Sequence, residues 1–114
     1  MSIQARDGPA HVVTGVQLDA RGQVVRVRWY LADRRELACP ADHVPSPLSQ
    51  EAVVDTVEVV DKLLDAEPVV PLFQGPDGAR LGDAVKVHVE SDGSESIEVD
   101  PRRPGRSLRD LPRL

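Results

Sequence analysis

The alternation of apolar and polar side chains between residues 24 and 31 constrains the fold more than any other feature of this sequence. Every second residue is large and apolar, which is the pattern of a strand that buries one face. That apolar set is Val25, Val27, Trp29 and Leu31. Residues 11–18 alternate in the same way, with Val12, Thr14, Val16 and Leu18 on one side. A short loop containing Gly22 separates the two segments, so we expect an antiparallel hairpin.

Further strands are expected on both sides of a proline-rich loop at residues 40–47. Residues 37–39 favour a short strand before it. Residues 69–73 favour a strand that is irregular or at an edge, because Pro71 has no amide hydrogen to donate. Residues 85–89 alternate valine with polar side chains, and a turn at 91–94 leads to a return strand containing Ile97 and Val99.

Residues 48–65 carry the helical pattern of the chain. Apolar side chains recur at intervals of four, three and four residues, at Val53, Val57, Val60 and Leu64. A second, charged stripe consists of Glu51, Asp55, Glu58, Lys62 and Asp65. Ser46 followed by Pro47 is a typical helix start, and Pro68 limits the helix to residue 67 or earlier. We therefore expect an amphipathic helix whose valine–leucine stripe enters the core.

These elements predict an α+β domain in which one antiparallel sheet of five or six strands packs a single helix on one face. A chain of 114 residues has room for one modest core. The expected organisation is a flexible leader at 1–10, the domain at 11–100 and a flexible tail at 101–114. No stretch has the length and apolarity of a membrane span or the pattern of a signal peptide, so we expect a cytoplasmic protein without a membrane partner.

Charge is unevenly distributed along the chain. Residues 101–114 contain five arginines and one acid, a net charge of +4, whereas the rest of the chain carries −9. The five arginines are Arg102, Arg103, Arg106, Arg109 and Arg113. An acidic body repels phosphate backbones, so a nucleic acid is expected as a partner only through this tail.

Several short motifs are similar to a small bacterial family of uncharacterised proteins, the domain of unknown function numbered 3892. The motifs are Thr14-Gly15-Val16, Val27-Arg28-Trp29, Val59-Val60-Asp61 and Ser96-Ile97-Glu98-Val99-Asp100. The resemblance covers roughly residues 12–100. Because that family has no assigned chemistry, the resemblance implies a topology and no functional residue.

One group of side chains suggests chemistry. Cys39, Asp42 and His43 lie together in the proline-rich loop, where a thiolate beside an imidazole would suit a nucleophile or the start of a metal site. His11 and His88 are distant in sequence. A single cysteine excludes an internal disulfide, and the sequence contains neither a phosphate-binding loop nor a dinucleotide-binding fingerprint. No cofactor is expected.

The face of the sheet opposite the helix is the other candidate site. One helix cannot cover both faces, so the second face is expected to present a contact surface of Val13, Val24, Arg26, Arg28 and Tyr30. Tyrosine and arginine are enriched at the energetic centres of protein interfaces. We therefore expect a non-catalytic interaction or self-assembly module, with a second copy as the simplest partner. A small enzyme or metal protein centred on Cys39 and His43, and a nucleic-acid tether through the tail, are the alternatives.

Overall fold

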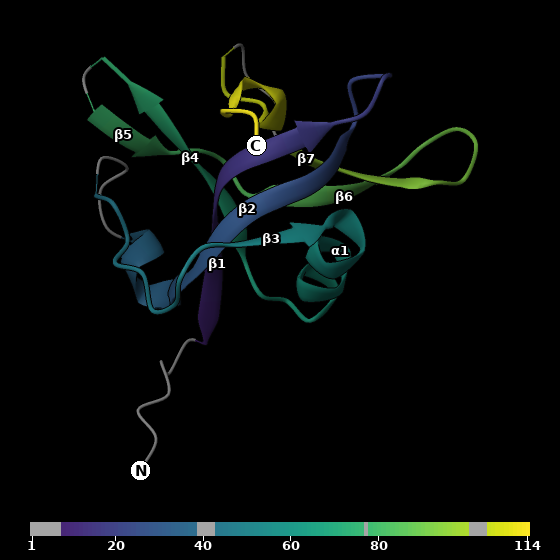
Figure 1. Ribbon diagram of the computed structural model, residues 1–114. Helices are drawn as coiled ribbons and strands as arrows, with labels where there is room; N and C mark the ends of the chain where they lie inside the picture. Colours follow the sequence, from purple (N-terminus) through teal and green to yellow (C-terminus); the bar gives the residue numbers. More distant parts are fainter. Residues whose placement is uncertain (1–7, 39–42, 77, 101–104) are drawn as a thin grey trace.

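The computed structural model describes residues 8–38, 43–76, 78–100 and 105–114. Within these ranges the chain forms seven strands, one α-helix and two short 3-10 helices (Figure 1). In chain order they are β1 (Pro9–Leu18), β2 (Val24–Asp33), η1 (Arg34–Ala38), β3 (Ala52–Asp55), α1 (Thr56–Leu64), β4 (Val69–Gly75), β5 (Gly78–Leu81), β6 (Val85–Val89), β7 (Glu95–Val99) and η2 (Leu108–Asp110). The α+β class is confirmed.

The expectation of one wholly antiparallel sheet is wrong. Five strands form a mixed sheet in the order β3-β2-β1-β4-β5, and β6 and β7 form a separate hairpin. All neighbours in the large sheet are antiparallel except β1 and β4, which run parallel. The reason lies in α1, which carries the chain from β3 at one edge back to β4 beyond β1. A helical crossover of this kind joins strands that point the same way.

The helix is shorter than its sequence pattern predicts. It begins at Thr56, where the Asp55 side chain accepts a hydrogen bond of 3.2 Å from the Glu58 amide. Ser46 does not start a helix, and its amide donates instead to the Glu36 carboxylate. Residues 52–55 are extended because their backbone pairs with the open edge of β2. Tertiary pairing therefore overrides the helical period in the first part of the segment.

The face of α1 that enters the core also differs from the prediction. The prediction placed Val53, Val57, Val60 and Leu64 inside. In the structure the fully buried residue is Val59, with Leu63 and Val60 packed beside it. Val57 and Leu64 are 67% and 74% exposed. Val53, on β3, is exposed as well. Of the predicted stripe, only Val60 contributes to the core.

Two β-bulges redirect the side chains of the first hairpin. Thr14 in β1 and Val25 in β2 each have no directly paired residue, so the register shifts at both points. Each extra residue moves the following side chains to the opposite face. As a result Val13 and Val16 share the main core, although simple alternation would put them on opposite faces, while Val12 faces the other way.

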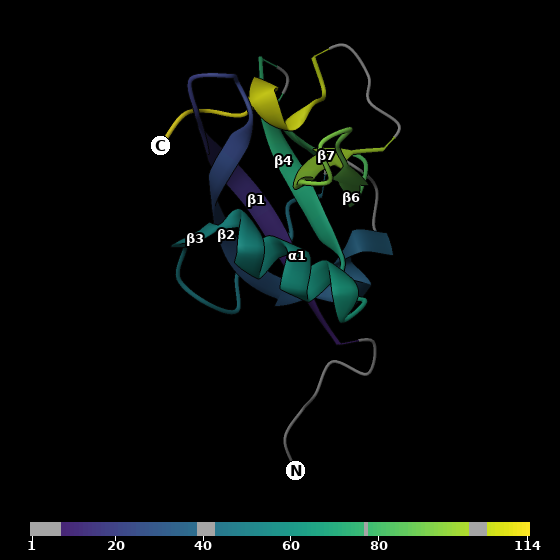
Figure 2. The same cartoon turned by 90° about the vertical axis from the view of Figure 1, so that its right-hand side faces the viewer.

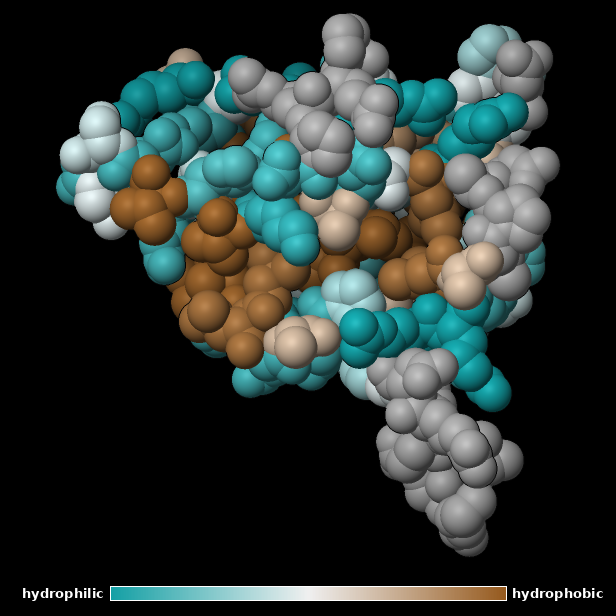
Figure 3. Space-filling model, turned by 180° about the vertical axis from the view of Figure 1, so that it is seen from behind, coloured by the Kyte–Doolittle hydropathy of each residue, from teal (hydrophilic) through white to brown (hydrophobic). Residues whose placement is uncertain are grey.

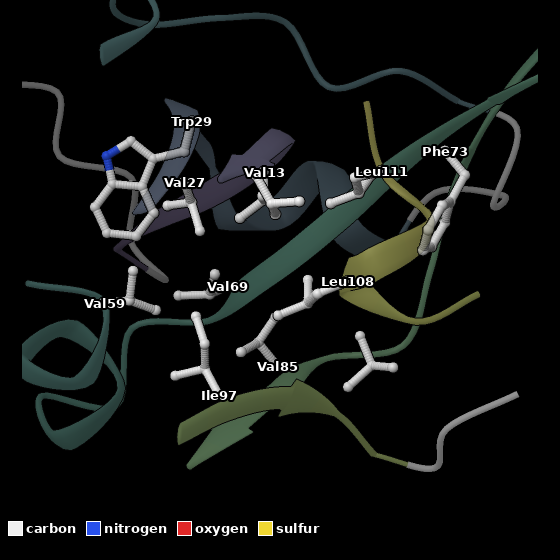
Figure 4. Packing of buried hydrophobic residues seen from close by; sticks show 12 residues of the cluster. Val13, Val27, Trp29, Val59, Val69, Phe73, Val85, Ile97, Leu108 and Leu111 are labelled. Carbon is white, nitrogen blue, oxygen red and sulfur yellow. The ribbon is translucent and has the colours of Figure 1, made fainter. Parts of the chain in front are cut away.

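The main core lies between one face of the sheet and a second layer made of α1, the β6–β7 hairpin and the C-terminal segment (Figures 2 and 4). The sheet contributes Val13, Val16, Val27, Trp29, Val69 and Phe73, and the second layer contributes Val59, Val85, Ile97, Val99, Leu108 and Leu111. The alternation of β6 placed Val89 in the core. Val89 is instead 72% exposed, because the end of the β6–β7 hairpin extends beyond the sheet that it packs against (Figure 1).

The opposite face of the sheet is covered by the chain itself. Val12, Tyr30, Ala32, Val70 and Leu72 form a second buried cluster there. The 3-10 helix η1 adds Leu37 to this cluster, and the segment that follows η1 contributes the buried Pro45. The prediction that the whole of this face stays open for a partner is therefore wrong, since η1 and the segment with Pro45 cover the part around Tyr30, while Arg26 remains exposed.

The C-terminal segment is part of the fold. Leu108 and Leu111 are almost fully buried in the main core, and the Val16 amide donates to the Pro112 carbonyl at 2.9 Å. The expected flexible tail is wrong for residues 105–114, because two leucines in this segment bury apolar surface that the sheet leaves uncovered. Residues 101–104 lie outside the described residues, as do residues 1–7 of the expected leader. Pro9 and Ala10 belong to β1.

Truncating Leu108 tests this arrangement. Because the side chain is fully buried, Leu108→Ala should lower the free energy of unfolding by about 2–5 kcal/mol. Leu48, 61% exposed, provides the matched control, and Leu48→Ala should change the free energy of unfolding by less than about 0.5 kcal/mol. Urea denaturation measures both. Equal losses in the two variants would contradict the docked C-terminal segment.

Candidate functional site

The five residues predicted to form one contact surface do not lie together. Val13 is buried in the main core, Val24 packs against that core, and Tyr30 is buried in the second cluster. Arg26 is exposed and donates to the Gln17 side chain at 3.2 Å, and Arg28 is half-buried. The bulges at Thr14 and Val25 turn Val13 and Val24 toward the main core, and the segment with Pro45 covers Tyr30 on the predicted face.

Tyr30 has a structural role on the second face. Its hydroxyl donates a buried hydrogen bond of 2.7 Å to the Pro45 carbonyl, which fastens the covering segment to the sheet. Burial of the phenol raises the pKa of Tyr30, and the carboxylates of Glu36 and Glu51 raise it further by disfavouring a phenolate.

Tyr30 is the sole tyrosine of the chain, so its ionisation can be followed by ultraviolet absorbance. In the folded protein phenolate absorbance should appear at higher pH than in urea, where the pKa is about 10. Because the folded pKa is the higher one, the corresponding stability is present below the unfolded pKa and disappears as the pH rises through the folded pKa. The Tyr30→Phe variant is the control, because it has no tyrosine and should show no phenolate absorbance. Coincident titrations in folded and unfolded protein would contradict the buried hydroxyl.

Of the predicted catalytic or metal-binding residues Cys39, Asp42 and His43, only His43 is among the described residues. Cys39 and Asp42 are outside them, so a nucleophile or metal site at this loop stays a prediction. His43 is described, and its Nε2 lies 2.9 Å from Glu36 Oε1. The same carboxylate accepts hydrogen bonds from the Ser46 amide. His43 and Glu36 thus hold the covering segment against η1.

The hydrogen bond from His43 is the main reason that the pKa of Glu36 is lowered, and the Ser46 amide lowers it further. A lowered folded pKa means that the carboxylate stabilises the fold above its unfolded value of 4.5 and that this contribution disappears as the pH falls through the folded pKa. Glu36→Gln should therefore be less stable than the parent near neutral pH, and the difference should shrink in acid. Urea midpoints measured across this range test it. A pH-independent difference would show that the charge has no role.

His11 is buried by the fold. Its Nε2 lies 2.8 Å from Glu67 Oε1, and its ring stacks on Trp29 with 4.4 Å between ring centroids. Its backbone amide also donates to the Pro68 carbonyl at 2.9 Å. These contacts fix the end of the α1 crossover to β1. His88 is an exposed residue of β6. Among the residues that the structure describes, no three histidine, cysteine, aspartate or glutamate side chains are grouped to hold a metal ion.

The described arginines of the C-terminal segment contact the protein itself. Arg106 lies over the Phe73 ring, 5.5 Å from its centroid. Arg113 donates to the carbonyls of Arg109 and Leu111 at 2.7 and 2.8 Å. Arg102 and Arg103 lie outside the described residues. A nucleic-acid tether through these arginines stays a prediction, but residues 105–114 are not a free arm.

The exposed apolar side chains of α1 form the most distinctive surface. We define the α1 surface as Val57, Val60 and Leu64, together with Val89 at the end of β6. Val57 and Leu64 are seven residues apart, two helical turns, and Val60 lies between them on the same side. Figure 3 shows hydrophobic side chains gathered over α1 and the end of β6. The sequence pattern had grouped Val57, Val60 and Leu64 correctly, but of the three it placed Val57 and Leu64 wrongly in the core.

A cleft of about 400 Å³ adjoins this surface. It lies between the turn of the β1–β2 hairpin and the β6–β7 hairpin, and Val89 is one of its lining residues. Val24 and Ile97 give it an apolar part, while Glu90 and Arg109 are charged. Val89 therefore belongs to both the α1 surface and the cleft.

The layer that carries the α1 surface is strongly acidic. Residues 55–67 contain five acids and one lysine, a net charge of −4, and residues 85–100 have the same composition and the same net charge. Since the whole chain carries −5, all other residues together carry +3. The two segments lie in the layer on one face of the sheet together with residues 105–114, whose three arginines and one aspartate carry +2 (Figure 1). The molecule therefore has an acidic side with exposed apolar groups and a weakly basic remainder.

Comparison with known proteins adds no assignment to this surface: the chain matches no protein-family model, no curated protein and no solved structure. The resemblance to the family of unknown function numbered 3892 stays a prediction. No helix within the described ranges is long and apolar enough to cross a membrane.

Proposed function

We propose that this protein is a non-catalytic protein-binding module and that it binds through the α1 surface. The observation that carries the proposal is the exposure of Val57 and Leu64, at 67% and 74%, on a helix whose adjacent face is already packed against the core. Folding leaves these two side chains exposed to water. A partner that covers them removes apolar surface from water, which favours binding.

Single apolar side chains on a surface are ordinary, so the grouping is what matters. Covering a valine or leucine side chain is worth about 1.5–3 kcal/mol, and Val57 and Leu64 lie on one stripe with the half-buried Val60. Val89 extends the apolar area onto a second element. Grouped exposed apolar side chains with a polar border are typical of protein interaction sites.

The position on the fold also supports binding. The helix is rigidly placed, because its N-terminus is capped by Asp55 and the segment after it is held by the contacts of His11 with Glu67 and Pro68. A partner therefore meets a preformed surface and does not have to order it, which lowers the entropic cost of association.

Site-specific photo-crosslinking tests this proposal in the cells that make the protein. A benzoylphenylalanine at position 64 should give a discrete crosslinked adduct with another polypeptide. The same probe at Ala38, at the exposed end of η1, and at Leu48, an exposed leucine elsewhere, provides the controls. Absence of an adduct at position 64, or the same adducts from all three positions, would overturn the proposed surface.

A further inference from the structure

We infer that the partner of the α1 surface is a basic amphipathic segment of another protein. This inference rests on the proposed function and specifies the chemistry of its ligand. It follows from the charges that surround the exposed apolar side chains.

The acids of α1 lie directly beside its apolar stripe. Asp61 comes four residues after Val57 and three residues before Leu64, so on a helix it is a neighbour of both. Glu58 and Asp65 continue the exposed acidic border. When a partner side chain covers Leu64, the partner residues next to it come within one helical turn of the carboxylates of α1.

The second border of the surface has the same sign. Val89 on β6 is followed at once by Glu90, and Glu95 is its direct partner on β7. The apolar side chains thus lie between two acidic edges. Arginine and lysine side chains can contact apolar surface with their methylene stems while their charges reach such edges, so basic residues fit both parts of this surface.

A symmetric dimer fits the same charges poorly. A two-fold contact through the α1 surface would place residues 55–67 and 85–100 of one copy, with a net charge of −8, against the same residues of the other copy. Like charges across an interface oppose association. An anionic nucleic acid or lipid surface is disfavoured for the same reason.

The length of the stripe suggests the form of the segment. Val57 and Leu64 are separated by seven residues, about 10.5 Å along the helix axis. Apolar side chains at positions i, i+3 or i+4, and i+7 of a partner helix match this span. The segment we infer has two to three helical turns, with apolar residues on one face and arginine or lysine beside them.

Binding of designed peptides to the intact protein tests the inference. The probe is a fluorescent helical peptide of about 18 residues with leucine on one face and arginine beside it. Two matched peptides serve as comparisons, one with every arginine replaced by glutamate and one with every leucine replaced by serine. Fluorescence anisotropy should show binding of the first peptide and, for the other two, binding at least about tenfold weaker.

Variants of the protein then locate the contact. Leu64→Ser should weaken binding of the basic peptide by about tenfold or more, whereas Leu48→Ser, at the other exposed leucine, should not. Asp61→Lys should weaken binding several-fold and reduce its dependence on salt. Ala38→Lys, which adds the same kind of charge at the exposed end of η1, should leave binding unchanged. All four positions are exposed, so the variants should remain folded, and circular dichroism checks this.

Each other outcome overturns the inference in a recognisable way. Equal binding of the acidic peptide would remove the charge argument, and equal binding of the serine peptide would indicate simple ion exchange. Concentration-dependent self-association that Leu64→Ser abolishes, without peptide binding, would identify a second copy as the partner. If position 64 crosslinks to a polypeptide but the basic peptide does not bind, the proposed function stands and the inference fails. If neither occurs, both fail.

Discussion

β1 and β4 pair in parallel, and this pairing fixes the path of α1 across the sheet. His11, Val12 and Val13 lie opposite Val69, Val70 and Pro71. To reach this position from β3 the chain must pass over two strands, and α1 makes that passage on one face of the sheet. The pairing therefore decides where the helix lies, which of its sides meets Trp29 and Val27, and which side stays exposed.

The contacts around His11 hold the end of this crossover. The imidazole links Glu67 to Trp29, and the backbone amide binds the Pro68 carbonyl. A histidine that seemed isolated in the sequence is thus used to join a strand, a helix end and a core aromatic ring. On the opposite face, Tyr30 with Pro45, and His43 with Glu36, hold a segment without regular structure in a comparable way. Polar pairs fasten the connections, and apolar packing fills the layers between them.

This arrangement separates the two sides of the molecule by chemistry. On one face of the sheet, η1 and the described residues between it and β3 cover a second apolar cluster. The other face carries α1 and the β6–β7 hairpin, whose valines and leucine extend beyond the core among carboxylates. The same amphipathic helix therefore has a packed side with Val59 and Leu63 and an exposed side with Val57 and Leu64, and the exposed side is the one through which we propose that it binds.

The elements with a local signature could be predicted from the amino-acid pattern: both hairpins, a helix within residues 48–65, the strand at Pro71 and the α+β class. The pattern also showed that Val57, Val60 and Leu64 share one side of a helix. Four features depend on long-range contacts and could not be predicted: residues 52–55 pair with β2, β5 forms, bulges at Thr14 and Val25 turn side chains of the first hairpin to the other face, and Leu108 and Leu111 enter the core. The reason is physical: alternation and helical period report that a face is apolar, but whether that face is covered depends on which distant strand edge and which neighbouring layer the chain reaches.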